Sequence, residues 1–151
     1  NLNLNTKNKI SNILKIKTRS QPPLPAAMYI SKKAANLGFE WEKLDDIWDK
    51  FYEEVDEFKE AIKNNDKLNS QEELGDILFT LTNIARWKNL DLEESLSAAN
   101  QKFLSRFAYI EDKSNGELSK QSKIKYQELW GKAKLLESTK HSKNFKSESN
   151  E

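Results

Sequence analysis

Two short acidic stretches, EEVDE and ELGD, contain carboxylates with the spacing of metal ligands on helices. In the first stretch, Glu54 and Glu57 are three residues apart and Glu53 precedes them, and in the second, Glu73 and Asp76 are three residues apart. A separation of three residues turns a side chain by about 60° around a helix, so each pair shares one face. Each pair also borders an apolar stripe. If the two helices pack side by side, we expect the two pairs to converge at the edge of the core.

Clustered carboxylates repel one another unless a cation lies between them. Mg²⁺ takes about six oxygen ligands and usually keeps water and substrate phosphate among them. The sequence has no cysteine and one histidine, His141, so hard oxygen ligands for Mg²⁺ or Mn²⁺ are favoured over a zinc site. The alternative is an acidic helix face in solvent, because EExxE alone is a weak signal. The second pair, on the next helix, strengthens the metal hypothesis.

Three basic side chains are candidates for binding phosphate. Lys102 and Arg106 are four residues apart on one helix face, and Lys50 lies one turn before Glu54. Cations beside a metal cluster would share the charge of a triphosphate. Salt bridges to nearby carboxylates are the alternative for all three. Trp130 is a candidate for stacking on a base, with a place in the core as its alternative.

The remaining tryptophans, at positions 41, 48 and 87, have no motif around them. We interpret them as packing residues.

Charge is distributed unevenly along the 151 residues. Residues 40–76 hold 14 Asp/Glu against 5 Lys/Arg, whereas the whole chain has a net charge of +1. The acidic middle argues against a nucleic-acid-binding protein. No run reaches the ~18 apolar residues of a membrane span, and no secretory signal is apparent. We therefore expect a cytoplasmic protein with no membrane or nucleic-acid partner.

The elements that position these side chains are predicted to be helices. Apolar residues recur every three or four positions, no run alternates as a strand does, and Gly and Pro total only seven residues. Asp91 is a predicted N-cap with Glu94 in the capping-box position, and Gly38 is a predicted helix stop. The prediction is an all-α, antiparallel four- to five-helix bundle. Its helices cover about 25–36, 45–64, 71–88, 91–112 and 119–136, with loops at 64–70 and 113–117.

Composition also suggests the organisation of the chain. Residues 1–23 indicate a linker or partly ordered arm, 24–137 a single domain, and 138–151 a polar, disordered tail. The chain begins at Asn1 rather than Met, which favours a processed chain or a piece of a longer protein.

Taken together, these residues resemble the MazG family of nucleoside triphosphate pyrophosphohydrolases. The resemblance covers about 24–111 and includes KKAANLGFEW, the EEVDE stretch, EELGDILFTLTNIAR and NQKFLSRFAYIE, with weaker likeness around 128–134. The family hallmark is EExxE followed, after a variable gap, by ExxD. Here 15 residues separate Glu57 from Glu73, which is a gap of the usual size.

The resemblance implies a MazG-like all-α fold that forms a homodimer or a higher homo-oligomer. It implies Mg²⁺-dependent hydrolysis of NTPs or dNTPs to the monophosphate and pyrophosphate. It leaves open whether the chain is the C-terminal catalytic half of a two-domain member or a single-domain member. By motif position, the metal ligands would be Glu54, Glu57, Glu73 and Asp76, the catalytic water-orienting residue Glu53, the phosphate-binding residues Lys50, Lys102 and Arg106, and the nucleotide contact Trp130.

Two alternatives remain open. A related all-α pyrophosphatase would act on a narrower substrate, such as dUTP, phosphoribosyl-ATP or a guanosine tetraphosphate alarmone. A non-catalytic helical dimerisation module would use its acidic residues only for solubility. Nucleotide hydrolysis assays separate these alternatives.

Overall fold

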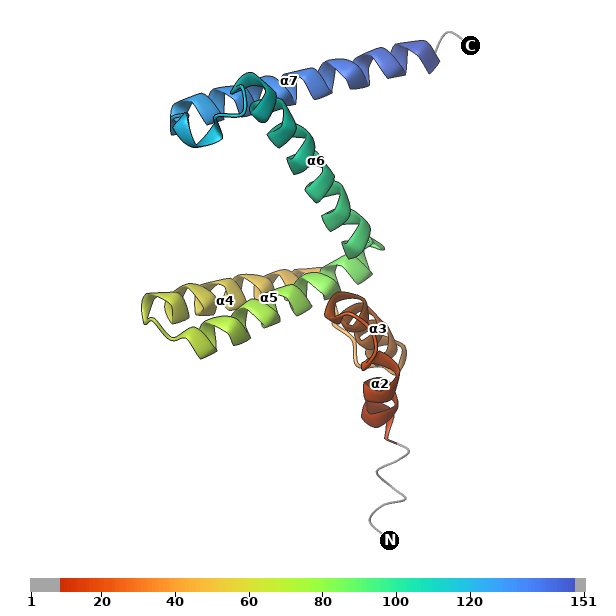
Figure 1. The fold of residues 1–151 in the computed structure, drawn as a ribbon. Helices are drawn as coiled ribbons and strands as arrows, with labels where there is room; N and C mark the ends of the chain where they lie inside the picture. Colours follow the sequence, from red (N-terminus) through yellow and green to blue (C-terminus); the bar gives the residue numbers. More distant parts are fainter. Residues whose placement is uncertain (1–8, 149–151) are drawn as a thin grey trace. The chain divides into compact units, whose positions relative to one another are not determined.

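The computed structural model describes the backbone of residues 9–148 and the side chains of residues 9–141. Every regular element in this range is helical, as Figure 1 shows, and the all-α prediction is confirmed. The chain divides into two compact units, Asn1–Ser95 and Leu96–Glu151. The elements are α2 (Ile10–Thr18), α3 (Pro23–Asn36), α4 (Leu44–Lys63), α5 (Lys67–Trp87), α6 (Leu92–Lys113), the 3-10 helix η1 (Leu118–Lys120) and α7 (Lys123–Glu148).

The first unit is organised around a helical hairpin, in which α4 and α5 lie side by side (Figure 1). Their connection is shorter than predicted, since α5 begins at Lys67 rather than at position 71. The reason is an N-cap: the Asp66 carboxylate accepts the backbone N–H of Asn69 at 3.1 Å, which satisfies a donor of the first helical turn. Asn65 turns the chain with a φ of +55°, a conformation that Asn tolerates better than most residues.

Small and branched apolar side chains fill the contact between these helices. Ile47 is fully buried and Ala61 nearly so on α4, and Ile84 and Ala85 are buried on α5. Three of these four, Ile47, Ile84 and Ala85, follow the apolar spacing that predicts the two helices.

Two leucines of α5 that recur with helical spacing, and that this spacing predicts to be buried, are exposed in the single chain. Leu74 is 44% and Leu78 50% accessible to solvent. The sequence pattern of α5 therefore specifies a wider apolar face than the hairpin covers.

A clamp of polar contacts ties the segment between α3 and α4 onto α5. Gly38 stops α3 with a φ of +92°, as predicted. Two residues later, Glu40 accepts from both terminal nitrogens of Arg86, one at 2.6 Å. The indole of Trp87 and the backbone N–H of Trp41 donate to the same carboxylate, at 3.0 and 2.9 Å. Hydrogen bonds from Arg86 hold the pKa of Glu40 at about 2, below its usual value.

The second unit contains most of α6, with η1 and α7. Ile110, Leu129 and Ala133 are its buried apolar residues. Ser122 caps α7 by accepting the backbone N–H of Lys125 at 3.2 Å, so α7 begins later than the predicted position 119.

Helix extends into both segments that the sequence assigns to an arm and a tail. α2 lies within 1–23, and α7 continues to Glu148. No Gly or Pro follows Gly131, so no helix-breaking residue lies between Gly131 and the end of α7 at Glu148. The boundaries of a single domain at 24–137 stay a prediction. None of the described helices is long and apolar enough to cross a membrane.

The Glu40–Arg86 clamp generates a pH-dependent prediction. Because the pKa of Glu40 is lowered from 4.5 to about 2, the clamp stabilises the fold above pH 4.5 and is lost as pH falls toward 2. We expect Glu40→Gln to lower the free energy of unfolding by about 1–2 kcal/mol at pH 7. The difference from wild type, measured by urea unfolding, should shrink between pH 4.5 and 2. Glu42→Gln, at an exposed neighbouring position, is the control, and a difference independent of pH would contradict the clamp.

Candidate functional site

Three of the four predicted metal-ligand residues meet between α4 and α5. Each of Glu54, Glu57 and Glu73 offers a carboxylate oxygen, and these atoms all lie within 4.8 Å of one another. Glu54 and Glu57 are one helical turn apart on α4, and the hairpin brings Glu73 of α5 against them. The convergence follows from helical periodicity and the short connection.

Glu54 is the centre of this cluster and is almost fully buried, at 5% exposure. Lys50, one turn earlier on α4, contacts one of its oxygens at 2.8 Å. This hydrogen bond lowers the pKa of Glu54 and raises that of Lys50. Burial alone would favour the neutral acid. Lys50 therefore keeps Glu54 ionised inside the hairpin.

Glu73 shows how strongly the carboxylates repel one another. Its pKa is raised to about 7, first by the hydrogen bond that its protonated form makes to Glu54, and then by burial and the charge of Glu57. Glu73 therefore keeps a proton at pH values between 4.5 and about 7, at which an unperturbed glutamic acid would be ionised.

The donor set fits a hard divalent cation. The second oxygens of Glu54 and Glu73 are buried and, when both side chains are ionised, have no hydrogen-bond partner among the described residues. Buried acceptors without a partner are costly, and clustered carboxylate oxygens match the ligand preference of Mg²⁺ or Mn²⁺. A bound cation would supply both oxygens with a partner and replace the proton near Glu73.

The other two predicted acidic residues lie beside the cluster rather than within it. Asp76 is exposed, one turn after Glu73 on α5, and lines a cavity together with Glu54. Glu53 contacts Lys50 at 3.3 Å and is 56% exposed at its side chain. Metal binding by Asp76 and water orientation by Glu53 stay predictions.

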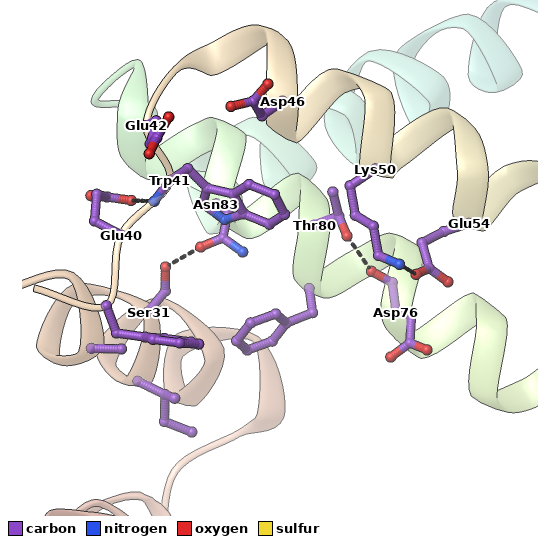
Figure 2. A pocket seen from close by; sticks show the side chains of 14 residues that line it. Ser31, Glu40, Trp41, Glu42, Asp46, Lys50, Glu54, Asp76, Thr80 and Asn83 are labelled. Carbon is purple, nitrogen blue, oxygen red and sulfur yellow. Dashed lines mark hydrogen bonds and ion pairs between the residues drawn. The ribbon is translucent and has the colours of Figure 1, made fainter.

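A cavity of about 750 Å³ opens next to the carboxylates (Figure 2). At its acidic end lie Lys50, Glu54 and Asp76, and Figure 2 shows Lys50 of α4 reaching Glu54 across from Asp76 of α5. The remaining wall combines apolar and aromatic side chains with polar groups of α3 and α5 and with three further carboxylates, Glu40, Glu42 and Asp46. It is formed by Ile30, Ser31, Ala34, Phe39, Glu40, Trp41, Glu42, Asp46, Phe79, Thr80 and Asn83.

Three further predicted site residues, Lys102, Arg106 and Trp130, belong to the second unit. The guanidinium of Arg106 lies over the Trp130 ring, 5.0 Å from its centroid, and forms an ion pair with Glu137 at 3.0 Å. The structure thus brings two predicted substrate contacts together and gives Arg106 the salt bridge that the sequence left as its alternative. Lys102 is exposed. Participation of all three in the carboxylate site stays a prediction.

Sequence reasoning missed most of the cavity wall. Trp41, interpreted as a packing residue, lines the cavity, and Ser31 and Asn83 are buried polar residues within it. Ser31 and Asn83 bond to each other across 52 positions of the chain. The one available signal was a polar residue, Asn83, immediately before Ile84 and Ala85 on the apolar face of α5.

Comparison with known proteins places these residues in a family. Residues 44–109 match the MazG nucleotide pyrophosphohydrolase domain. The chain is 42% identical over 97 residues to the nucleoside triphosphate pyrophosphohydrolase of Escherichia coli, a match that covers 62% of this chain and 36% of that protein. It is 36% identical over 116 residues to the nucleoside triphosphate pyrophosphohydrolase/pyrophosphatase MazG of Thermotoga maritima, covering 75% of this chain and 44% of the relative.

The chain therefore spans less than half the length of either relative. The matched region contains the whole carboxylate cluster, with Lys50, Asp76, Lys102 and Arg106, whereas Trp130 lies outside it. The sequence match and the helical structure of this segment lead to the same conclusion. Residues 44–109 belong to the MazG nucleotide pyrophosphohydrolase domain family.

Proposed function

We propose that this chain hydrolyses nucleoside triphosphates, NTPs or dNTPs, to the nucleoside monophosphate and pyrophosphate with Mg²⁺ as cofactor. The observation that carries the proposal is the three-carboxylate cluster, with two buried oxygens lacking partners, beside an aromatic cavity of about 750 Å³. A cavity of this volume suits a small-molecule ligand. The family match and the names of the two relatives support the same reaction.

Each side chain has a role in this proposal. The cation would be held by Glu54, Glu57 and Glu73, with Asp76 at the cavity wall. When bound, Mg²⁺ polarises phosphate oxygens and lowers the pKa of water. Lys50 would bind a phosphate oxygen, exchanging part of its contact with Glu54, and Glu53 would orient the attacking water. Lys102 and Arg106 would bind the outer phosphates, and Trp130 would contact the nucleotide. Water adds to the α-phosphorus as the bond to the bridging oxygen breaks, so pyrophosphate leaves.

Product analysis tests the reaction. The chain should convert ATP, GTP, CTP, UTP and their deoxy forms to monophosphate and pyrophosphate with Mg²⁺, and EDTA should stop the conversion. Diphosphate and orthophosphate would show that a different bond is cleaved. Turnover of only dUTP, phosphoribosyl-ATP or an alarmone would favour the narrow-substrate alternative. No turnover by folded protein would favour a non-catalytic module.

Removal of a carboxylate should separate catalysis from folding. We expect Glu54→Gln and Asp76→Asn to lower kcat/KM by at least about 100-fold, because each removes a ligand or an orienting group from the metal end. Circular dichroism should show that both variants keep their helices. Asp56→Asn, at an exposed position on α4, should retain wild-type rates. A near-normal rate in Asp76→Asn would remove that residue from the site.

The cation should also stabilise the folded chain directly. At pH 8, above the pKa of about 7 of Glu73, MgCl₂ or MnCl₂ should raise the melting temperature of the wild type by mass action. Glu73→Gln should melt at or above the wild-type temperature in EDTA, because repulsion is relieved, and should lose the metal-dependent rise. Glu72→Gln, one residue away and exposed, is the control. Equal metal responses in both variants would contradict the site.

We also propose that the chain forms a homodimer. The 44% and 50% exposure of Leu74 and Leu78 supports an apolar face on α5 that a second copy would cover. Light scattering should give twice the 17.6 kDa of one chain, and a monomer at micromolar concentration would contradict the proposal.

A further inference from the structure

Asn83 is a polar side chain buried at the wall of the cavity. It is 9% exposed and lies on α5 beside the buried Ile84. Asp76 precedes it by seven residues, which is about two helical turns or roughly 10 Å along α5. Both residues therefore face the same cavity, Asp76 near its acidic end and Asn83 farther from the carboxylate cluster.

A hydrogen-bond relay fixes the orientation of the Asn83 amide. Arg86 has only donors, so the Ser31 hydroxyl oxygen must accept from its Nε at 2.7 Å. The single hydroxyl hydrogen of Ser31 is then donated to Asn83 Oδ1, also at 2.7 Å. A second nitrogen of Arg86 donates to the same oxygen at 3.4 Å. Both acceptor sites of Oδ1 are used, and the amide cannot turn over without losing these contacts.

The amide nitrogen is left as a donor without a partner among the described residues. Figure 2 shows the Asn83 oxygen bonded to Ser31 and the amide nitrogen turned away from Ser31, and Asn83 lines the cavity. This N–H group is available to donate to water or to a ligand in the cavity. The relay therefore presents to the cavity a fixed group that donates and cannot accept.

The surroundings favour a flat ligand that carries an acceptor. Phe39, Trp41 and Phe79 line the cavity, and aromatic rings stack well on planar bases. Glu40, which anchors the Trp41 backbone, is bound to Arg86. The same guanidinium thus contacts the Asn83 amide and, through Glu40, the backbone of Trp41.

We propose that Asn83 is a specificity-determining residue that donates a hydrogen bond to the carbonyl of the nucleobase. This inference rests on the proposed function, which places the triphosphate at the carboxylate end. Uracil and hypoxanthine carry a carbonyl where cytosine and adenine carry an amino group, which is itself a donor. A donor-only amide selects the carbonyl-bearing bases and leaves an amino group unpaired.

The test compares kcat/KM for two substrate pairs that differ at this group: UTP against CTP, and ITP against ATP. The wild type should favour UTP and ITP. Asn83→Leu, close in shape but without a donor, should reduce each preference by about 3- to 10-fold. Asn83→Asp, which offers acceptors only, should shift the ratios further toward CTP and ATP.

Two further variants guard against a purely structural effect. Ser31→Ala keeps Asn83 but removes the hydroxyl hydrogen that Ser31 donates to Asn83 Oδ1. It should lower the UTP/CTP and ITP/ATP ratios of kcat/KM by a smaller factor than Asn83→Leu does. This variant provides the test if Asn83→Leu fails to fold. Thr82→Val removes a buried hydroxyl that donates to the backbone oxygen of Leu78 on the same helix, and should leave the ratios unchanged. Unchanged ratios in the Asn83 variants, or an equal loss for all substrates, would overturn the role of Asn83 while leaving the hydrolase function intact. No hydrolysis by folded wild type would instead refute the proposed function.

Discussion

The ionised, buried carboxylate of Glu54 is the constraint on which the site depends. Burial of a charge is unfavourable unless a partner compensates, and Lys50 supplies that partner at 2.8 Å. Only one oxygen of Glu54 contacts Lys50, and the other has no partner among the described residues when Glu73 is ionised. The hairpin therefore contains a local excess of negative charge, visible in the raised pKa of Glu73. A divalent cation resolves this excess without any rearrangement of the helices.

Arg86 has a corresponding role at the other end of the cavity. Its guanidinium joins three segments that are remote in sequence: α5 itself, Ser31 on α3, and Glu40 in the connection to α4. Charge-assisted, two-pronged contacts of this kind restrict geometry more than single hydrogen bonds do. One cation thus contacts both the Asn83 amide and, through Glu40, the backbone of Trp41, whereas the cluster of Glu54, Glu57 and Glu73 lies between α4 and α5.

Local sequence pattern was sufficient for the helices and for part of the site. Periodicity and capping residues predicted most helix ends within a few residues, although α2 was not predicted and α7 continues past the predicted end at 136 to Glu148. EExxE and ExxD identified three side chains that the structure brings within 4.8 Å. The start of α5 was misplaced because the cap at Asp66 lies within a polar run that also resembles a loop. The cavity wall was missed for a different reason. Ser31 contacts Asn83 across 52 positions and Glu40 contacts Arg86 across 46, and no local pattern reports such pairings.

The placement of Glu73, Asp76, Thr80 and Asn83 on one uninterrupted helix has a consequence for how the chain tolerates change in length. A residue inserted or deleted between Asp76 and Asn83 would rotate everything beyond it by about 100° and shift it by about 1.5 Å, so the two ends of the cavity would no longer face the same way. The turn of Asn64 to Asp66 has no such effect, because a longer connection leaves the phase of α5 unchanged. The gap between the two acidic motifs can therefore vary in length when the variation falls in the turn. The number of residues between Asp76 and Asn83 must instead stay constant for both to face the cavity.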